Sequence, residues 1–366
     1  MKIAILTSSR ADYGILYPLI NKLNADNFFN VDIIAFGSHL SKISCKTKEL
    51  ILKDGFSIKY GLDTSPKNDS PLEISNSMAN TINEFAKIWK KETYNLVIVL
   101  GDRYEMFAAS ASAIPFNIKI AHIHGGETTS GAIDDCFRNS ITQMASIHFA
   151  ASEVYKSRVI ELKNSNLNVF NTGSLSIDNL KKMKLLSITD FQKKFKIDLN
   201  IPTILITFQP ETVDFEKNKK YISILTKTLK ELSKFQLVIT MPNEDTMGIY
   251  IRKKLENFIK KNANAIKIET FGTIGYLSCM KHCKMMLGNT SSGFIEAAFF
   301  SKYVINIGNR QSGRIVTSNI ISVDIDKIKI LDAVNNFRKY KEVKYSGIYG
   351  NGKTSEKIIS ILKNKC

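Results

Sequence analysis

The chain has 366 residues, more than one ordinary hydrophobic core accommodates, so we expect two domains. Lys and Arg number 51 against 34 Asp and Glu, a net charge of +17, yet the basic residues are scattered and form no stripe with aromatic residues of the kind that binds single-stranded nucleic acid. The apolar runs are strand-sized rather than membrane-spanning and the five cysteines are unevenly spaced, so we expect no nucleic-acid partner, no membrane partner and no disulfide framework.

The amino-terminal half alternates predicted strands with predicted helices. Its first apolar run is short and charged residues follow at once, which is unlike a signal peptide and favours a cytoplasmic location. Strands separated by helical segments predict a parallel sheet with right-handed crossovers. We predict strands over 2–6, 31–36, 96–100, 118–123 and 147–151, and helices over 12–23, 72–92, 104–113 and 134–144.

The pattern breaks after NTGS, where residues 174–200 become polar and rich in lysine, and we interpret this stretch as a linker. The carboxyl-terminal half then repeats the alternation and ends in an amphipathic helix. We predict strands over 203–208, 235–240, 265–269, 285–289 and 303–307, and helices over 217–233, 293–300 and 354–366. The expected fold class is α/β, with two doubly wound, Rossmann-like domains facing a cleft. The predicted parts are a first domain over 1–173, a second over 174–350 and a closing helix over 351–366.

Ionisable side chains gather over residues 96–138, where two of the predicted strands end. Open α/β sheets place ligand chemistry beyond the carboxyl ends of their strands, so we expect these side chains to converge on one crevice. Helix capping explains the acidic pair at 134–135, but not the carboxylates and histidines at strand ends. Removing and returning a proton at carbon needs at least two such groups in different environments. The group comprises Asp102, Arg103, Glu105, His122, His124, Glu127, Asp134, Asp135 and Arg138.

Two turns with small hydroxyl residues open predicted helices and are suited to hold an anion. SSRADYG presents Arg10 and backbone amides. GNTSSGFIEAA presents Ser291, Ser292 and Gly293, with Glu296 placed to accept hydrogen bonds from ribose hydroxyls. An ordinary capped helix is the alternative in both places. No G-x-G-x-x-G turn follows the first strand and no P-loop lysine is present, which disfavours a nicotinamide dehydrogenase and ATP hydrolysis.

Eight segments, taken in order, resemble the hydrolysing nucleotide-sugar 2-epimerases of the bacterial sialic and legionaminic acid pathways. They are SRADYG, LGDRYE, HIHGGE, DDCFRNSITQ, NTGS, QPET, GNTSSGFIE and IGNRQSGR. The resemblance as a whole runs from residue 3 to about 315. The resemblance implies a fold similar to GT-B glycosyltransferases, a homodimer, and chemistry without a metal or nicotinamide cofactor. We therefore expect an enzyme that takes a nucleotide-sugar substrate.

The same resemblance implies a two-step reaction on a nucleotide-linked 2-acetamido sugar. A base removes the C2 proton while the nucleoside diphosphate leaves C1, giving a 2-acetamidoglycal. Water then adds at C1, and a proton returns to C2 from the opposite face. By position, the acid/base candidates are Asp102, His124, Glu127 and Asp134. The substrate-binding candidates are Arg10, Arg103, Asp135, Arg138, Gln209, Asn243, Ser291, Ser292, Gly293, Glu296, Arg310 and Arg314.

Two positions depart from the pattern of that family. His124 stands where many relatives have glutamate, so either its imidazole or Glu127 would exchange the second proton. Gln209 stands where relatives commonly have histidine. Its amide cannot titrate, although it can still bind substrate through hydrogen bonds.

Among substrates we rank UDP-N-acetylglucosamine first, which would give N-acetylmannosamine and UDP. The alternative is a GDP- or UDP-linked 2,4-diacetamido-2,4,6-trideoxyglucose (N,N'-diacetylbacillosamine), which would feed legionaminic acid. A second alternative is a GT-B glycosyltransferase, which would need an acceptor and would not exchange the C2 proton. A third alternative is a non-catalytic protein that binds sugar nucleotides or nucleic acid, and only the net positive charge supports it.

Overall fold

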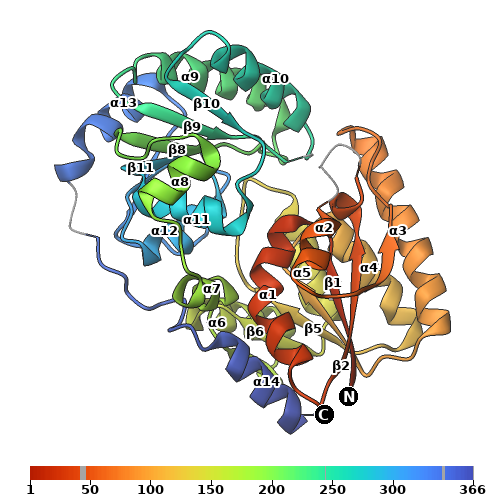
Figure 1. Cartoon of the computed structure of the whole chain (residues 1–366). Helices are drawn as coiled ribbons and strands as arrows, with labels where there is room; N and C mark the ends of the chain where they lie inside the picture. The colour runs from red at the N-terminus through yellow and green to blue at the C-terminus, as the bar shows by residue number, and fades with distance from the viewer. Residues whose placement is uncertain (42–46, 244, 340–342, 366) are drawn as a thin grey trace. The chain divides into compact units, whose positions relative to one another are not determined.

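A computed structural model describes residues 1–41, 47–243, 245–339 and 343–365. The chain forms two compact units, and each contains one parallel sheet with helices on both faces (Figure 1). The first unit comprises Met1–Glu127, Asp134–Lys181 and Ile348–Cys366, and the second comprises Thr128–Ile133 and Lys182–Gly347. The predicted α/β class with two doubly wound, Rossmann-like domains is confirmed.

The first sheet has the strand order β3-β2-β1-β4-β5-β6-β7 with parallel neighbours. Its strands are β1 (Lys2–Thr7), β2 (Asn30–Phe36), β3 (Ile58–Leu62), β4 (Leu96–Leu100), β5 (Ile120–Ile123), β6 (Ile147–Ala150) and β7 (Val169–Asn171). The sequence pattern does not predict β3 and β7, because both lie at sheet edges, where β3 is partly exposed and β7 is very short. The order reverses between β1 and β4, the kind of position at which open α/β sheets bind ligands.

Helices cover both faces of the first sheet. They are α1 (Arg10–Asn24), α2 (Lys48–Lys53), α3 (Pro71–Lys91), α4 (Tyr104–Ala113), α5 (Asp134–Met144), α6 (Glu153–Lys163), α7 (Leu175–Lys182) and α14 (Thr354–Lys365). Side chains alternate between the faces along a strand. Ile3 and Ile5 of β1 therefore pack in the core that contains α1 and α14, whereas Ala4 and Leu6 pack in the core that contains α3 and α4.

The second sheet has the strand order β10-β9-β8-β11-β12-β13, again with parallel neighbours. Its strands are β8 (Thr203–Thr207), β9 (Gln236–Thr240), β10 (Ala265–Ile268), β11 (Met285–Gly288), β12 (Val304–Ile307) and β13 (Ile320–Val323). The edge strand β13 is not among the predicted strands. It is short, and only its first two residues are buried.

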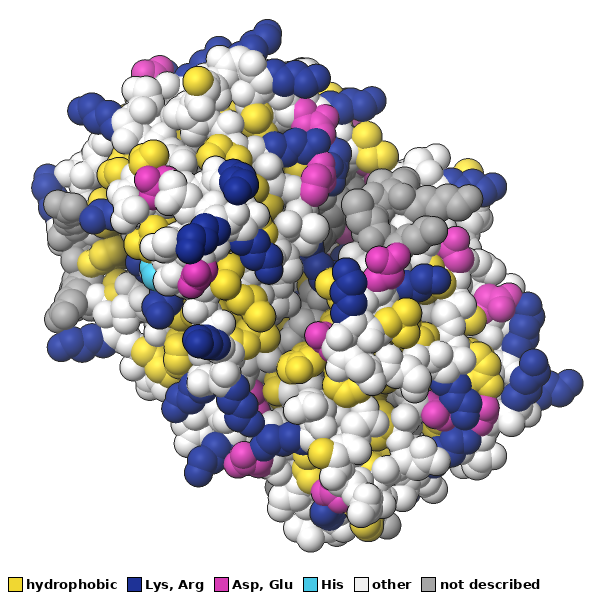
Figure 2. All heavy atoms as spheres, viewed as in Figure 1, with side chains coloured by type: hydrophobic (Ala, Val, Ile, Leu, Met, Phe, Trp, Pro, Cys, Tyr) yellow, Lys and Arg dark blue, Asp and Glu magenta, His cyan; other side chains and the backbone are white. Residues whose placement is uncertain are grey.

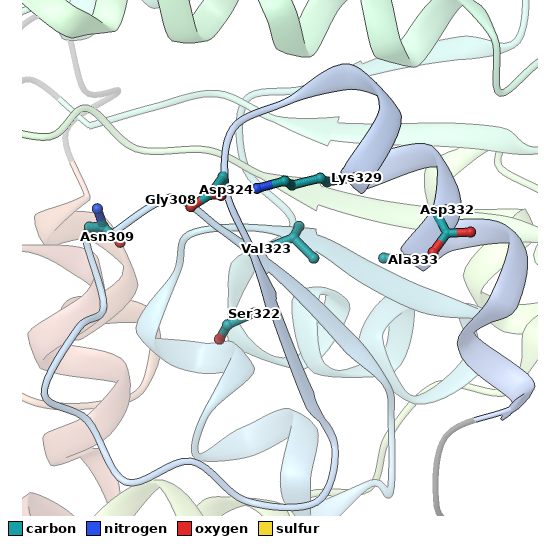
Figure 3. A pocket seen from close by; sticks show the side chains of 8 residues that line it. All are labelled: Gly308, Asn309, Ser322, Val323, Asp324, Lys329, Asp332 and Ala333. Atoms are coloured by element: carbon teal, nitrogen blue, oxygen red, sulfur yellow. Dashed lines mark hydrogen bonds and ion pairs between the residues drawn. The ribbon is translucent and has the colours of Figure 1, made fainter.

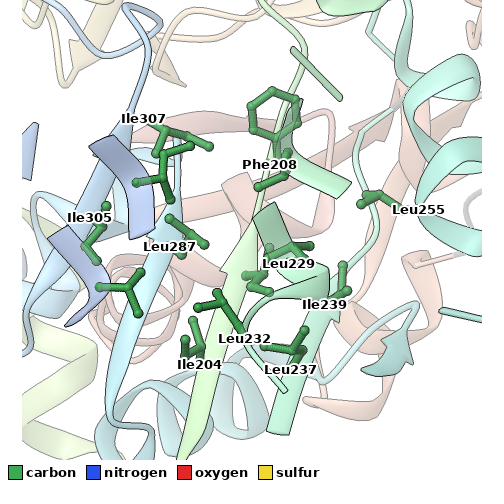
Figure 4. Close-up of a cluster of buried hydrophobic side chains, with 14 of the residues drawn as sticks. Ile204, Phe208, Leu229, Leu232, Leu237, Ile239, Leu255, Leu287, Ile305 and Ile307 are labelled. Carbon is green, nitrogen blue, oxygen red and sulfur yellow. The ribbon is translucent and has the colours of Figure 1, made fainter. Parts of the chain in front are cut away.

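The second sheet also separates two cores. Its helices are α8 (Ile188–Phe195), α9 (Asn218–Lys230), α10 (Gly248–Ile259), α11 (Gly272–His282), α12 (Glu296–Phe299) and α13 (Lys327–Asn336). Ile204 of β8 joins Leu229 of α9 and Leu255 of α10 in one cluster (Figure 4). Leu205 faces the opposite side and packs with Phe191 of α8. Central strands are buried on both faces, which is why they appear as continuous apolar runs.

The predicted linker over 174–200 is wrong, because α7 and α8 lie there. Leu175 and Ile177 of α7 are completely buried, as is Phe191 of α8. Each helix also carries two exposed lysines in its second half, and these make the stretch resemble a loop in sequence. The first unit therefore extends past the predicted boundary at 173 to Lys181, and it resumes at Ile348.

The predicted carboxyl-terminal helix is confirmed as α14, although its last predicted residue, Cys366, lies outside the described residues. Asp178 of α7 is completely buried and accepts hydrogen bonds from the backbone N–H groups of Thr354 (2.8 Å) and Ser355 (2.7 Å). A carboxylate at a helix N-terminus satisfies amides that have no partner within the helix. This cap makes α14 part of the first unit.

The stretch Thr128–Ile133 belongs to the second unit, although the residues on both sides of it belong to the first. The Ser130 N–H donates to the Ser312 carbonyl (3.0 Å), and the Thr212 N–H donates to the Gly131 carbonyl (3.2 Å). The Ile133 N–H donates to the Thr212 hydroxyl (3.0 Å). These bonds hold the stretch on the second unit, and no sequence pattern predicts them.

Acid should destabilise the first unit through its buried histidines. Burial lowers the pKa of His39 and His122 to about 4 and that of His148 to about 3. The unfolded chain protonates near the ordinary pKa of about 6.5, so below that pH it takes up protons that the folded state does not. We expect the free energy of unfolding to decrease as the pH falls from about 6.5 towards 4. Urea midpoints measured at about pH 7.5 and about pH 5 check this.

Replacing His148 by Phe should make the urea midpoint less sensitive to pH, because one protonation difference between the folded and unfolded states is removed. His282, which is only half-buried and lies in the second unit, provides the control, and His282→Gln should keep the pH sensitivity. Equal midpoints at the two pH values would contradict the expectation.

Candidate active site

Asp102 lies in the turn that follows β4, and His122 holds the backbone of this turn. His122 Nε2 is 2.8 Å from the Gly101 carbonyl, and its Nδ1 is 3.1 Å from the Thr142 hydroxyl of α5. Burial lowers the pKa of His122 to about 4, so the ring is neutral and donates to the carbonyl. The expectation that His122 faces a crevice is therefore wrong, because at its place in β5 the side chain points under α5.

The HIHGGE turn after β5 brings His124 and Glu127 together. His124 has a φ of +67°, a left-handed conformation that few residues other than glycine adopt. A Cβ on Gly126 would lie 2.2 Å from the Tyr155 carbonyl of α6, so only glycine fits there. His124 Nδ1 is 3.4 Å from Glu127 Oε1, and the two residues are 7% and 5% exposed. The turn therefore buries an imidazole and a carboxylate side by side.

Arg138 of α5 connects these turns. Its Nη2 donates to Asp102 Oδ2, and its Nη1 donates to Asp135 Oδ1 and to the Glu127 carbonyl (2.9 Å). Asp134 opens the same helix and is half-buried. The structure thus gathers the acid/base candidates of the first unit around one end of α5.

Two other predicted residues of the first unit lie at helix starts. Arg103 pairs with Glu105 at the beginning of α4, with its Nε and Nη2 each 3.0 Å from a carboxylate oxygen. Arg10 is the first residue of α1 and is half-buried. The Ser9 hydroxyl caps this helix by accepting from the Asp12 N–H (3.3 Å). An ordinary capped helix, which we considered as the alternative to an anion site, is therefore present here, and Arg10 is its first residue.

In the second unit, Gln209 stands at the end of β8 in a fixed orientation. Its N–H donates to Asn289 Oδ1 (2.7 Å) and its carbonyl accepts from Asn289 Nδ2 (2.8 Å). Its own Oε1 accepts from the Asn243 N–H (2.9 Å). A Cβ on Gly288 would lie 1.9 Å from the Thr207 carbonyl, so β11 approaches β8 this closely only with glycine. Because Oε1 is held by Asn243, the Nε2 group of the same amide points away from Asn243 and can donate hydrogen bonds elsewhere.

The IGNRQSGR loop after β12 is tied to the same strand ends. Arg310 Nε donates to the Pro210 carbonyl (3.1 Å), and Gln311 Nε2 donates to the Asn289 carbonyl (2.9 Å). Arg314 Nε donates to Gln311 Oε1 (2.6 Å). Buried Glu211 accepts from the Asn309 N–H (3.1 Å), and burial raises the pKa of its carboxyl group. Glu211 was not predicted, although it lies within the QPET segment.

The helix predicted over 293–300 is wrong in its extent. The chain instead forms a 3₁₀ turn at Ser291–Gly293 and then α12, which begins at Glu296 and ends at Phe299. The Gly293 carbonyl accepts from Asn319 Nδ2 (3.2 Å), so it is bound outside a helix. The Ser292 hydroxyl lies 2.6 Å from the Tyr276 hydroxyl. In this described segment no long helix begins at Ser291, so the helix dipole expected to attract an anion there is absent. Ser291 and Glu296 remain binding candidates because their side chains and the nearby backbone amides can still bind a ligand.

Replacing Glu296 by Ala should mainly raise KM and change kcat little. A ribose contact contributes equally to the ground state and the transition state, so its loss weakens binding without slowing the chemical step. Steady-state kinetics with the sugar nucleotide that the unmodified enzyme converts check this. A defect confined to kcat would contradict a ribose contact.

A cavity of about 350 Å³ opens in the second unit beside the carboxyl ends of β12 and β13 and the start of α13 (Figure 3). Lys329 pairs with Asp324 at its rim. None of the predicted site residues lines it. Its lining comprises Gly308, Asn309, Ser322, Val323, Asp324, Lys329, Asp332 and Ala333.

One face of the molecule shows how its basic residues are distributed. Figure 2 shows Lys and Arg side chains spread among acidic and apolar ones over the visible face. Within residues 1–41, 47–243, 245–339 and 343–365, no group of three or more His, Cys, Asp or Glu side chains is arranged to hold a metal ion. No helix in the described ranges combines the length and apolarity needed to cross a membrane.

The two Rossmann-like units define a GT-B-like fold class. Two solved structures share this fold. One is UDP-GlcNAc 2-epimerase from Neisseria meningitidis bound to UDP-GlcNAc, with a TM-score of 0.86, 20% identity and full coverage of both chains. The other is UDP-GlcNAc 2-epimerase from Methanocaldococcus jannaschii in complex with UDP-GlcNAc and UDP, with a TM-score of 0.83, 20% identity and full coverage of both.

Sequence comparison specifies the family. The profile described as UDP-N-acetylglucosamine 2-epimerase matches residues 21–363. GDP/UDP-N,N'-diacetylbacillosamine 2-epimerase (hydrolyzing) from Campylobacter jejuni is 36% identical over 328 residues, covering 89% of this chain and 85% of the relative. UDP-N,N'-diacetylbacillosamine 2-epimerase (hydrolyzing) from Legionella pneumophila is 31% identical over 363 residues, covering 99% and 95%. The chain belongs to the UDP-N-acetylglucosamine 2-epimerase family and is an enzyme of the hydrolysing nucleotide-sugar 2-epimerase type.

Proposed function

We propose that the substrate is a GDP- or UDP-linked N,N'-diacetylbacillosamine. The supporting observation is that the two relatives described above, each more than 30% identical, carry this substrate in their names. A UDP-N-acetylglucosamine 2-epimerase from Neisseria meningitidis is 25% identical over 366 residues. UDP-N-acetylglucosamine, which we ranked first from the sequence, therefore becomes the second candidate.

In the proposed reaction the C1–O bond to the nucleoside diphosphate breaks as a base removes the C2 proton. The C2–H electron pair forms the C1=C2 double bond of a glycal, and the diphosphate leaves with the C1–O pair. Water then adds its oxygen to C1, and C2 receives a proton on the opposite face. The products are a free sugar with manno configuration and a nucleoside diphosphate.

The geometry of the first unit supports two proton-transfer groups in different environments. Asp102 is 25% exposed at its side chain and pairs with the guanidinium of Arg138. His124 and Glu127 are buried together in the neighbouring turn. We assign the first proton transfer to Asp102 and the second to the His124–Glu127 pair. Asp134 at the start of α5 is the further candidate.

Binding of the nucleotide is assigned to the strand ends of the second unit. Ser291, Glu296, Arg310 and Arg314 follow β11 and β12, where parallel sheets bind ligands. Gln209 adds an oriented amide donor at the end of β8. Arginines and amides of this kind stabilise the charge that develops on a leaving diphosphate.

Product analysis in deuterated water tests the proposal. The enzyme is incubated separately with UDP- and GDP-linked diacetylbacillosamine and with UDP-N-acetylglucosamine, and sugar and nucleotide are measured by mass spectrometry. We expect release of nucleotide together with free sugar carrying one deuterium at C2 from a diacetylbacillosamine substrate. Turnover of UDP-N-acetylglucosamine alone would overturn the substrate assignment. Nucleotide release without label at C2 would overturn the mechanism.

The same assay separates the glycosyltransferase alternative. A GT-B transferase needs an acceptor and leaves the C2 proton in place, so it would give neither product in water alone. Adding candidate acceptors should change nothing if the epimerase assignment is right.

A further inference from the structure

Arg138 is a deeply buried charged group near the proposed acid/base residues. It lies on α5, and the residue is 1% exposed. Its two terminal nitrogens donate to acceptors from three segments: Asp102 after β4, the Glu127 carbonyl after β5, and Asp135 at the start of α5. One guanidinium therefore joins all the segments that carry the proposed proton-transfer groups.

This arrangement is unlike that of an arginine that receives a substrate phosphate. A phosphate ligand needs donors that point into accessible space, whereas both terminal nitrogens of Arg138 are bonded to protein oxygens. Burying a charge is costly unless it is paired and hydrogen-bonded. Two carboxylates and a carbonyl supply that compensation here, so the internal contacts account for the residue.

The contact also orients Asp102. Arg138 holds Oδ2, while among the described residues Oδ1 of Asp102 has no hydrogen-bond partner. The backbone on the other side of Asp102 is held at Gly101 by His122. A carboxylate fixed at one oxygen and open at the other can accept a proton in one defined direction.

We propose that Arg138 is a positioning residue. It orients Asp102 towards the C2 proton and holds the His124–Glu127 turn in a fixed position relative to Asp102. This inference rests on the proposed function and replaces the expectation that Arg138 binds substrate. Arg138 reaches these acceptors from two separate terminal nitrogens of one rigid plane. The donors of lysine all share one nitrogen, so lysine cannot reproduce the geometry even though it keeps the charge.

Loss of the guanidinium should leave a recognisable pH signature. Without it, Asp102 and Asp135 would both lose the guanidinium that they share, so one of them would hold a proton at higher pH. The other charged and titratable side chains on neighbouring segments are Asp134 beside Asp135 on α5, His122, His124 and Glu127 within or after β5, and the Arg103–Glu105 pair at α4. All of these are present in both the variant and the parent, so the change in profile reports the removed charge.

The first test compares Arg138→Gln with the unmodified enzyme, using the rate of deuterium incorporation at C2, the pH profile of kcat/KM and the affinity for the nucleoside diphosphate. We expect incorporation to fall by about 100-fold or more near neutral pH, with the acid limb displaced to higher pH. Nucleotide affinity should stay within about twofold of the parent. The control is Arg252→Gln, because Arg252 pairs with Glu269 at the surface of the second unit and should leave every readout unchanged.

Arg138→Lys keeps the proposal testable if Arg138→Gln does not fold. This variant keeps the positive charge but loses the planar guanidinium. We therefore expect turnover to fall by about 10-fold or more, while the acid limb of the pH profile of kcat/KM hardly shifts. Nucleotide affinity should again be unchanged.

Three results would overturn the proposal: a folded Arg138→Lys enzyme at the parental rate, a loss of nucleotide affinity with normal turnover, or a slowed Arg138→Gln enzyme with an unmoved pH profile. Failure of the proposed function is seen separately, because the unmodified enzyme would then give no label at C2 with any of the sugar nucleotides.

Discussion

Replacing Asp102 by Asn should lower kcat by at least about 100-fold while nucleotide affinity stays nearly intact. Asparagine has the same shape and still offers an oxygen to Arg138, but its amide cannot accept the C2 proton. The loss therefore falls on the proton-transfer step rather than on folding or binding. Steady-state kinetics measure kcat, deuterium incorporation at C2 measures the proton-transfer step, and calorimetric titration with the nucleoside diphosphate measures nucleotide affinity.

A matched control for this substitution is Asp26→Asn in the first unit. Asp26 follows α1 and pairs with Lys363 of α14, and it belongs to no proposed site. The control should keep the parental rate and nucleotide affinity. If Asp102→Asn also stays within a few-fold of the parental rate, Asp102 is not the base, and Asp134 becomes the next carboxylate to examine.

Replacing Glu127 by Gln should likewise lower turnover by at least about 100-fold. Glu127 lies 3.4 Å from His124, and its removal deprives the imidazole of its acidic partner. If the two act as one proton-transfer unit, the loss in either single variant should equal most of the loss in the double variant. Rates of C2 labelling and of nucleotide release in the same reaction give this comparison.

The matching variant at the other member of the pair is His124→Asn. Asparagine tolerates the left-handed backbone at this position better than most residues, so it removes the imidazole while keeping the turn. Losses that simply multiply in the double variant would show that the two side chains act independently. A Glu127→Gln enzyme near the parental rate would leave His124 as the exchanging group.

The fold could be predicted from the sequence wherever strands are buried on both faces. The runs at 96–100 and 203–208 are apolar throughout because helices cover both sides of β4 and β8. The edge strand β3 escaped prediction because its residues are only partly buried and alternate with exposed ones. The helices α7 and α8 were missed because their composition is polar and rich in lysine. In α7 several of the buried residues are themselves polar, and in α8 only Phe191 is buried.

Prediction of the candidate site was uneven for a related reason. The positions of Asp102, His124 and Glu127 after parallel strands could be recognised, since charged residues after apolar runs have few structural explanations. The roles of His122 and Arg138 could not. Residue type does not reveal which carbonyls and carboxylates the fold brings within hydrogen-bonding distance, and both side chains prove to be internally bonded.

The sequence by itself determined the α/β class, the central strands and the segments that carry the family resemblance, because these depend on local periodicity and on residues close in the chain. Only the tertiary structure decided that Thr128–Ile133 joins the second unit, that Asp178 caps a helix beginning at Thr354, and that Arg138 spans three segments. Each of these depends on at least one pairing of polar atoms that are far apart in the chain, and such pairings are set by how the elements pack rather than by any local pattern.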